Sequence, residues 1–298
     1  MALREYLIGE VTQDYADGLL TRREAMRRLG LLALSATAAS AALAACGNGD
    51  GGASATRQPT ATPTSGRGAT TGATSPEAVR FSGPSGELQA AWAVSPTPAA
   101  AVLVIHENRG LTPHFQDLVG RLATEGYGAL CVDLLSPMGG TSALTDPAAA
   151  PTALADAPMD RLLGDLRAGI DELQRRVPGN KVGAVGFCFG GGMTWNLLNA
   201  GEQRLAAAVP FYGPAPENPD FSRAKAAVLG IYAGLDERVN ASRERAEAAL
   251  RKAGLKHEIR TFAGADHAFF NDTGQRYNAK AAGDAWTALL DWFKQHLS

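Results

Sequence analysis

From Ala78 to the end of the chain, short apolar segments alternate with longer segments in which apolar residues recur at helical spacing. This alternation is typical of a mostly parallel sheet with helices on both faces, an α/β fold. The run AAVLVIHE predicts a buried central strand. We expect strands at residues 87–94, 100–107, 126–135, 181–187, 205–212, 226–234 and 257–263, and helices at 112–125, 159–177, 193–199, 240–253 and 278–296.

The first 46 residues differ from this pattern. Apolar residues at roughly helical spacing precede Thr21-Arg22-Arg23, and an uncharged run rich in Ala and Leu follows from Leu29 to Ala45. The arginine pair resembles a twin-arginine export signal. The sequence LAAC at the end of the Ala- and Leu-rich run resembles a bacterial lipobox, in which Cys46 is lipidated and becomes the mature N-terminus. The run is short and weakly apolar for a stable membrane span, which needs ~20 apolar residues.

We therefore interpret residues 1–46 as a signal and export segment with a lipobox, and the protein as a cell-envelope lipoprotein tethered to the membrane. An uncleaved anchor, a soluble periplasmic or secreted form, and an intracellular Ala-rich helix are the alternatives. Residues 47–77 consist mainly of Gly, Ser, Thr, Ala and Pro, with no aromatic residue, and predict a flexible linker. The catalytic domain would then occupy residues 78–298.

Charge excludes one class of partner. The 298 residues include 28 basic and 30 acidic side chains, so the chain as a whole has no attraction for nucleic acid. We expect a small-molecule partner and a monomeric protein.

The stretch GFCFG, Gly186 to Gly190, fits the nucleophile-elbow pattern G-x-S-x-G with cysteine in place of serine. A strand is predicted before Cys188 and a helix after it, and the helix N-terminus would favour the thiolate. A buried structural cysteine is the alternative, and Cys131 in ALCVDLL fits that description. A phosphate-binding loop is excluded, because no lysine follows the glycines and the G-x-G-x-x-G spacing is absent.

A cysteine nucleophile needs a base, and the chain has five histidines. Only His267 is predicted to lie in a loop after the last strand, which makes it the candidate general base. Asp236 follows the preceding strand and reproduces the order nucleophile, acid, histidine. Glu237 is its nearer rival, and Asp266 is expected to point elsewhere. The candidate triad is therefore Cys188, His267 and Asp236.

From about Val79 to His296 the chain resembles the dienelactone hydrolase family of α/β-hydrolases. The motifs that carry the resemblance are LVIHENRGL, VDLLSP, VGAVGFCFGGG, FYG, AGLDERV and ADHAFFN, in that order. The resemblance implies an α/β-hydrolase fold and the same triad. It also implies that Glu107 matches a glutamate beside the resting thiol, which is linked to thiolate formation when substrate binds. From the residues alone, Glu107 could equally be a structural acid.

Several further residues are candidates for the site. The oxyanion hole should use the backbone N–H groups of Phe189 and Asn108. Arg109 would bind a substrate carboxylate or hold its own loop. Carboxylate recognition is in doubt, because an arginine that follows the histidine closely in some relatives has no counterpart before Arg276. Tyr212 and Phe269 are further substrate-binding candidates, and the loop at 136–158 could cover the site.

These residues predict a hydrolase that cleaves a lactone or carboxylic ester through an acyl-enzyme. No metal or organic cofactor is expected, because the histidines lack ligand spacing. A broad carboxylesterase or other acyl hydrolase is the alternative within enzymes, and a non-catalytic surface binding module is the alternative outside them.

Overall fold

The computed structural model describes residues 3–32, 34–46 and 75–298. The predicted linker lies outside the described residues as far as residue 74. The strands are β1 (Glu77–Gly83), β2 (Gly86–Val94), β3 (Ala100–Ile105), β4 (Tyr127–Val132), β5 (Val182–Phe187), β6 (Leu205–Phe211), β7 (Ala227–Ala233) and β8 (His257–Phe262). The helices are α1 (Leu3–Ala16), α2 (Arg22–Leu31), α3 (Ala36–Cys46), α4 (Pro113–Thr124), α5 (Ala150–Asp156), α6 (Met159–Arg176), α7 (Phe189–Asn199), α8 (Glu237–Asn240), α9 (Arg243–Lys252) and α10 (Ala279–Leu297).

The strands form a single sheet in the order β1-β2-β4-β3-β5-β6-β7-β8. Strand β2 runs antiparallel to β1 and to β4, and the remaining neighbours are parallel. Residues of β3 and β5 are wholly buried, as the continuous apolar run at 100–107 predicts. The mostly parallel sheet with flanking helices is the α/β architecture that the alternating segments predict.

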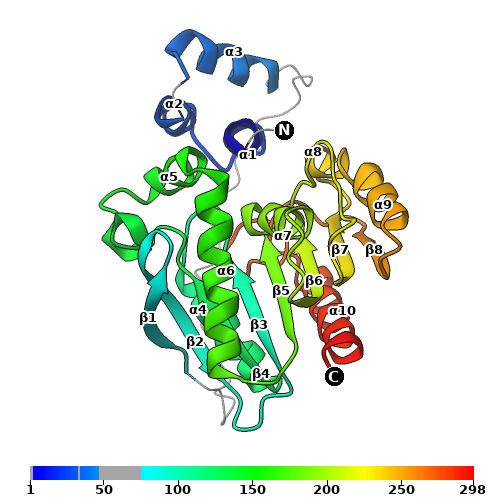
Figure 1. Cartoon of the computed structure of the whole chain (residues 1–298). Helices are drawn as coiled ribbons and strands as arrows, with labels where there is room; N and C mark the ends of the chain where they lie inside the picture. The colour runs from blue at the N-terminus through cyan, green and yellow to red at the C-terminus, as the bar shows by residue number, and fades with distance from the viewer. Residues whose placement is uncertain (1–2, 33, 47–74) are drawn as a thin grey trace.

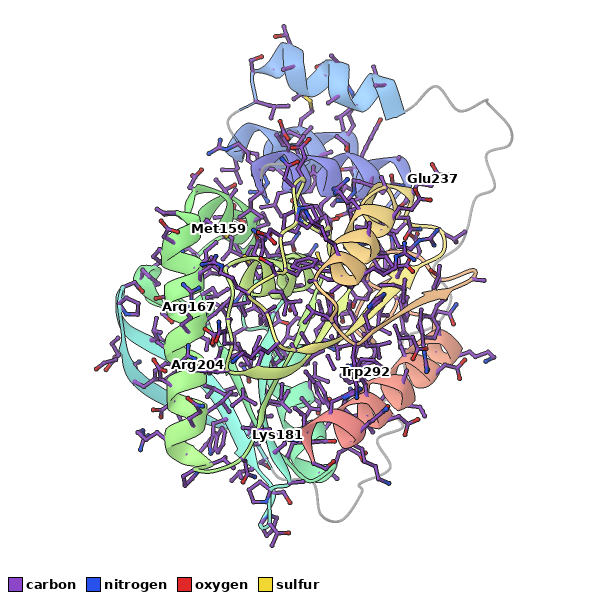
Figure 2. All side chains as sticks on the ribbon, turned by 45° about the vertical axis from the view of Figure 1, so that its right-hand side comes forward. Met159, Arg167, Lys181, Arg204, Glu237 and Trp292 are labelled. Atoms are coloured by element: carbon purple, nitrogen blue, oxygen red, sulfur yellow. The ribbon has the colours of Figure 1, made fainter. Side chains whose placement is uncertain are left out.

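Helices cover both faces of the sheet (Figure 1). On one face, α6 packs so closely that a Cβ at its Gly169 would lie 3.2 Å from a methyl carbon of Leu103 on β3. On the other face, a Cβ at Gly183 of β5 would lie 3.1 Å from the Phe293 ring of α10. Trp292, labelled in Figure 2, donates from Nε1 to the Ala227 carbonyl at the start of β7 (3.2 Å) and fixes α10 against the sheet.

The predicted strands and helices of residues 78–298 are present, with four differences. Helix α5 was not predicted, because it lies inside the segment at 136–158 that we expected to be a loop. Strand β1 was not predicted, because it lies at the sheet edge and its residues are exposed or half-buried, so they carry little apolar signal. Helix α7 begins at Phe189 and includes the glycines that we assigned to the turn. The helix predicted at 240–253 is divided into α8 and α9, which are separated at Ala241 and Ser242.

The N-terminal helices α1, α2 and α3 lie beyond the edge at which the parallel strands end (Figure 1). Helix α1 packs against α5, and its residues Tyr6, Leu7 and Val11 belong to the hydrophobic core. Among the described residues, no helix combines the length and the apolar character that a membrane crossing requires. The predicted signal segment is therefore folded onto the rest of the chain in this structure.

Candidate active site

Cys188 lies in the turn between β5 and α7, with φ 56° and ψ −116°. This left-handed conformation is rare for a residue with a side chain, and it marks a strained turn of the kind that nucleophile elbows use. The surrounding glycines explain how the turn fits. A Cβ at Gly186 would lie 2.1 Å from the Gly190 carbonyl oxygen, and one at Gly190 would lie 2.2 Å from the Ile105 carbonyl oxygen. The backbone of β5, α7 and β3 can approach this closely only without those side chains.

His267 and Asp236 come from loops that follow the last two strands. His267 Nδ1 lies 2.5 Å from Asp236 Oδ2, and both side chains are buried. The other carboxylate oxygen of Asp236 accepts from the Val239 backbone N–H (3.1 Å), which fixes the carboxylate at the start of α8. The rivals lie elsewhere: Glu237 is exposed, and Asp266 accepts the backbone N–H of His267 at 2.6 Å.

The charges around His267 favour its protonated form. Burial alone would lower the pKa of the imidazole, but the negative charges of Asp236 and Cys188 outweigh burial and raise the pKa to about 10. One donor atom each from His267, Cys188 and Glu10 lies within 4.8 Å of the others. The imidazole therefore faces the thiol on one side and is held by Asp236 on the other.

The other described histidines have different surroundings. His106 is buried, its Nε2 accepts from the Leu134 backbone N–H (3.1 Å), and burial lowers its pKa. His114 lies 2.9 Å from the Asp272 carboxylate through Nδ1. Of the residues proposed from the sequence, His267 is the one that the structure places against both Asp236 and Cys188.

Glu107 follows β3 and lies in the same cavity wall as Cys188. Its carboxylate accepts from Asn271 Nδ2 (2.9 Å) and from the Tyr212 hydroxyl (3.4 Å). Burial and the nearby Glu107 charge raise the pKa of Tyr212 well above its ordinary value, so Tyr212 stays a protonated donor. Glu107 is thus held by two donors near the thiol, and its role in thiolate formation stays a prediction.

The oxyanion hole was predicted to use the backbone N–H groups of Phe189 and Asn108, and the structure shows where these two residues lie. Phe189 is the first residue of α7, so its N–H belongs to the helix N-terminal groups that have no intrahelical acceptor. Asn108 lies in the loop that follows β3 and lines the cavity beside Cys188. An oxyanion hole requires that both N–H groups point at the substrate oxygen, and this role of Phe189 and Asn108 stays a prediction.

The substrate-binding candidates divide into two pairs. Arg109 and Arg276 line the cavity, whereas Tyr212 and Phe269 are fully buried and are not among its lining residues. The centroids of the Phe269 and Tyr212 rings are 5.4 Å apart, and Phe269 packs in the hydrophobic core. Arg276 is bound by acidic residues, including Asp14 of α1 at 2.8 Å.

A cavity of about 480 Å³ adjoins the thiol. Residues of the loop at 136–158 line it through Ala148, Pro151 and Thr152, so part of this loop reaches the site as predicted. The loop itself contains three short 3₁₀ turns and the helix α5. Residues of α1 and α2 also line the cavity, and sequence reasoning did not place these helices at the site.

Three residues at the thiol were not predicted. The Tyr6 hydroxyl lies 3.2 Å from Cys188 Sγ, and Glu10 Oε2 lies 3.6 Å from Sγ and 3.3 Å from His267 Nε2. Arg238 forms a buried ion pair with Glu10. Tyr6 and Glu10 share one face of α1 by their spacing of four residues, but no local pattern links that face to Cys188. Arg238 follows Asp236 by two residues, and this short distance in sequence was the only indication that Arg238 lies near the site.

One group of side chains among the described residues could hold a metal ion, and it includes Glu10 and two members of the candidate triad. Glu10, Cys188 and His267 supply oxygen, sulfur and nitrogen, a donor set that suits zinc. The guanidinium of Arg238 already pairs with Glu10, and its positive charge opposes a cation there. The prediction that the enzyme needs no metal remains untested.

Comparisons with known proteins identify the relatives of this chain. Residues 88–297 match the model of the Dienelactone hydrolase family. A relative in Escherichia coli O157:H7 and another in Methylorubrum extorquens, both provisionally named carboxymethylenebutenolidases, are 34% and 33% identical over 67% of this chain, and the matches span 78% and 73% of the relatives.

Solved structures agree with this match. A provisionally named dienelactone hydrolase from Klebsiella pneumoniae superposes with a TM-score of 0.65 and 30% identity over 74% of this chain and 99% of its own. The metagenomic P91, described as a dienelactone hydrolase-like promiscuous phosphotriesterase, gives a TM-score of 0.66 and 25% identity over 76% of this chain and all of its own. The chain therefore belongs to the dienelactone hydrolase family and is a hydrolase that acts on ester bonds.

Proposed function

We propose that the protein hydrolyses a lactone or carboxylic ester through a Cys188–His267–Asp236 triad and a thioester intermediate. The observation that carries the proposal is the arrangement of the triad: Cys188 on a strained elbow, and His267 between the thiol and a carboxylate 2.5 Å from its Nδ1. This is the arrangement of nucleophile, base and orienting acid that acyl transfer uses on many folds.

The first step forms the acyl-enzyme. The Cys188 thiolate attacks the substrate carbonyl carbon, and the oxygen takes up negative charge beside the N–H groups of Phe189 and Asn108. When this intermediate collapses, the carbon–oxygen bond to the alcohol breaks, and protonated His267 gives its proton to the leaving oxygen. Asp236 keeps the imidazole oriented and favours its charged form, in keeping with its raised pKa.

The second step releases the acid. Neutral His267 takes a proton from water as the water oxygen attacks the thioester carbon. The carbon–sulfur bond then breaks, the carboxylic acid leaves, and the thiolate–imidazolium pair is restored. Glu107, held by Tyr212 and Asn271, lines the same cavity as Cys188, and we propose that it takes part in thiolate formation when substrate binds.

The substrate class rests on the family. Relatives named carboxymethylenebutenolidases and dienelactone hydrolases support a lactone, and P91 is described as a promiscuous phosphotriesterase. A broad carboxylesterase is the second candidate, because Arg109 is exposed at the cavity and Arg276 is occupied by carboxylates of the chain itself. Arg276 is therefore not free for a substrate carboxylate, and selection for acidic lactones would depend on Arg109 alone.

The test combines a substrate panel with a trap for the intermediate. Unsaturated lactones, p-nitrophenyl esters and a phosphotriester would be offered to wild type, Cys188→Ala and Cys131→Ala, and the acyl-enzyme sought by mass spectrometry. We expect turnover and an adduct on Cys188 in wild type and Cys131→Ala, and neither in Cys188→Ala. Equal turnover by Cys188→Ala would reject the nucleophile, and no turnover by any of these proteins, or by a variant in which α1 is displaced from the thiol, would favour a binding module.

We also propose that residues 1–46 act as an export segment and that Cys46 is lipidated. The support is the sequence pattern of paired arginines followed by LAAC. The mature protein would then begin at Cys46 and partition into detergent. Mass spectrometry of the protein from a bacterial envelope fraction that finds residues 1–30 still attached would reject this proposal.

A further inference from the structure

Helix α1 covers the reactive face of the nucleophile. Its Tyr6 hydroxyl and Glu10 carboxylate lie 3.2 and 3.6 Å from Cys188 Sγ, and the thiol-bearing residue is only 3% exposed. Burial and the neighbouring Cys188 raise the pKa of Tyr6 well above its ordinary value, so the hydroxyl keeps its proton and can donate to the sulfur. The first helix thus contributes a donor and an acceptor to the catalytic centre.

Charged residues fasten α1 in this position. Glu10 pairs with Arg238, whose guanidinium also stacks over the Tyr6 ring at 4.6 Å. One turn further along, Asp14 pairs with Arg276 at 2.8 Å, and Asp17 pairs with the same guanidinium. The acidic face of α1 therefore matches two arginines that border the site, and Arg238 is largely buried there.

Apolar contacts add to these charges. Leu7 is wholly buried and Val11 is 5% exposed, although both lie on a helix outside the sheet and its flanking layers. Removing these aliphatic side chains from water is favourable and is not screened by salt, so the helix is bound by more than surface ion pairs.

The position of Glu10 excludes a substrate from the thiol. Attack requires a carbonyl carbon about 3–3.5 Å from the sulfur, with the leaving oxygen within reach of the imidazole. Glu10 Oε2 already occupies that space, 3.6 Å from Sγ and 3.3 Å from His267 Nε2. A carboxylate anion resists attack by a thiolate, so Glu10 fills the acyl position without reacting.

We propose that α1 is an intramolecular ligand of the active site, and that the full chain is latent until α1 leaves. The proposal rests on the ester-hydrolysing function proposed for Cys188. Substrate binds only to the open form, so its apparent affinity is reduced by the fraction of open molecules. Cleavage before Cys46, as proposed above, would remove α1, and export would then also activate the enzyme.

The test compares full-length proteins that differ in α1. Leu7→Asp places a charge at a wholly buried position and should release the helix, whereas Gln13→Asp changes an exposed position on the same helix. Two rates are measured for each protein: alkylation of Cys188 by iodoacetamide, with the buried Cys131 as an internal reference, and ester hydrolysis. We expect both rates to rise at least tenfold in Leu7→Asp and to be unchanged in Gln13→Asp.

A milder variant guards against misfolding. Glu10→Gln removes the ion pair with Arg238 and leaves α1 otherwise intact, and we expect both rates to rise severalfold. Equal alkylation of wild type and both variants would overturn the proposal. Faster alkylation with slower hydrolysis would also overturn it, because α1 would then be a working wall of the substrate pocket. Faster alkylation with no hydrolysis on any substrate would uphold the occlusion and reject the proposed function.

Discussion

The contact between Asp236 and His267 makes the charge of the imidazole a measurable property. Asp236→Asn replaces a carboxylate 2.5 Å from Nδ1 by a neutral amide of the same shape. The amide oxygen can still accept from the Val239 N–H, so the start of α8 should survive. The substitution therefore removes a charge with little change in packing.

The size of the effect follows from the pKa of His267. A rise from 6.5 to about 10 corresponds to roughly 5 kcal/mol in favour of the imidazolium, since each pKa unit is worth about 1.4 kcal/mol. Asp236 and Cys188 share this stabilisation against the cost of burial. We expect Asp236→Asn to lower the pKa by at least about two units and to lower kcat/KM about 10³-fold, because the imidazole loses both its charge partner and its fixed orientation.

The direction of the pH effect is set by the raised pKa. The stability that protonated His267 contributes is fully present below pH 6.5 and is lost as pH rises through about 10. The free energy of unfolding should therefore fall more steeply across this range in wild type than in Asp236→Asn. Denaturant unfolding at several pH values measures the difference.

Histidine NMR titration and ester hydrolysis complete the assay. Asp266→Asn is the matched control, because Asp266 meets His267 through its backbone N–H at 2.6 Å. The Asp266→Asn control should retain a high pKa at His267 and most of the hydrolytic activity. If Asp236→Asn kept a His267 pKa near that of wild type, or lost less than tenfold in kcat/KM, the role given to Asp236 would be refuted.

Two further predictions concern the elbow and the glutamate near it. Gly190→Ala should destabilise the fold by at least about 2 kcal/mol, because the new Cβ would lie 2.2 Å from a backbone oxygen of β3, whereas Gly283→Ala on α10, with open space around it, should be neutral or stabilising by up to about 1 kcal/mol. Denaturant unfolding of both proteins checks this pair, and an equal loss would contradict it. Asn271→Ala should lower kcat/KM about tenfold, because it removes the amide that donates to the Glu107 carboxylate at 2.9 Å. Kinetics in the Leu7→Asp background measure this loss, and unaltered kinetics would show that Glu107 needs no such support.

The fold and the chemical centre could be read from local sequence. Alternating segments predicted the sheet, and GFCFG predicted a turn that the structure confirms as left-handed at Cys188. The order of Cys188, Asp236 and His267 along the chain was enough to place them together, because parallel strands end at one edge of the sheet.

The covering of the site could not be predicted in the same way. Tyr6 contacts a residue 182 positions away and Glu10 pairs with one 228 positions away. The nearby arginines and LAAC dominate the sequence signal of this region and favour an export interpretation. Helix α1 docks through long-range ion pairs and a few buried apolar residues, and the spacing of those residues predicts a helix without indicating which surface it contacts. Phe269 was a substrate-binding candidate from the sequence, and its side chain is fully buried and is not among the residues that line the cavity.

Burial of the thiol beneath α1 also concerns its oxidation state. A thiolate paired with an imidazolium is the form that peroxides convert to sulfenic acid, and oxidation proceeds irreversibly from the sulfinic stage. Cys188 is shielded by the Tyr6 hydroxyl and the Glu10 carboxylate, and the free Cys131 lies buried in β4. The helix that keeps ester from the sulfur keeps oxidant from it as well, so the chain can store its nucleophile in the reduced state until α1 is displaced.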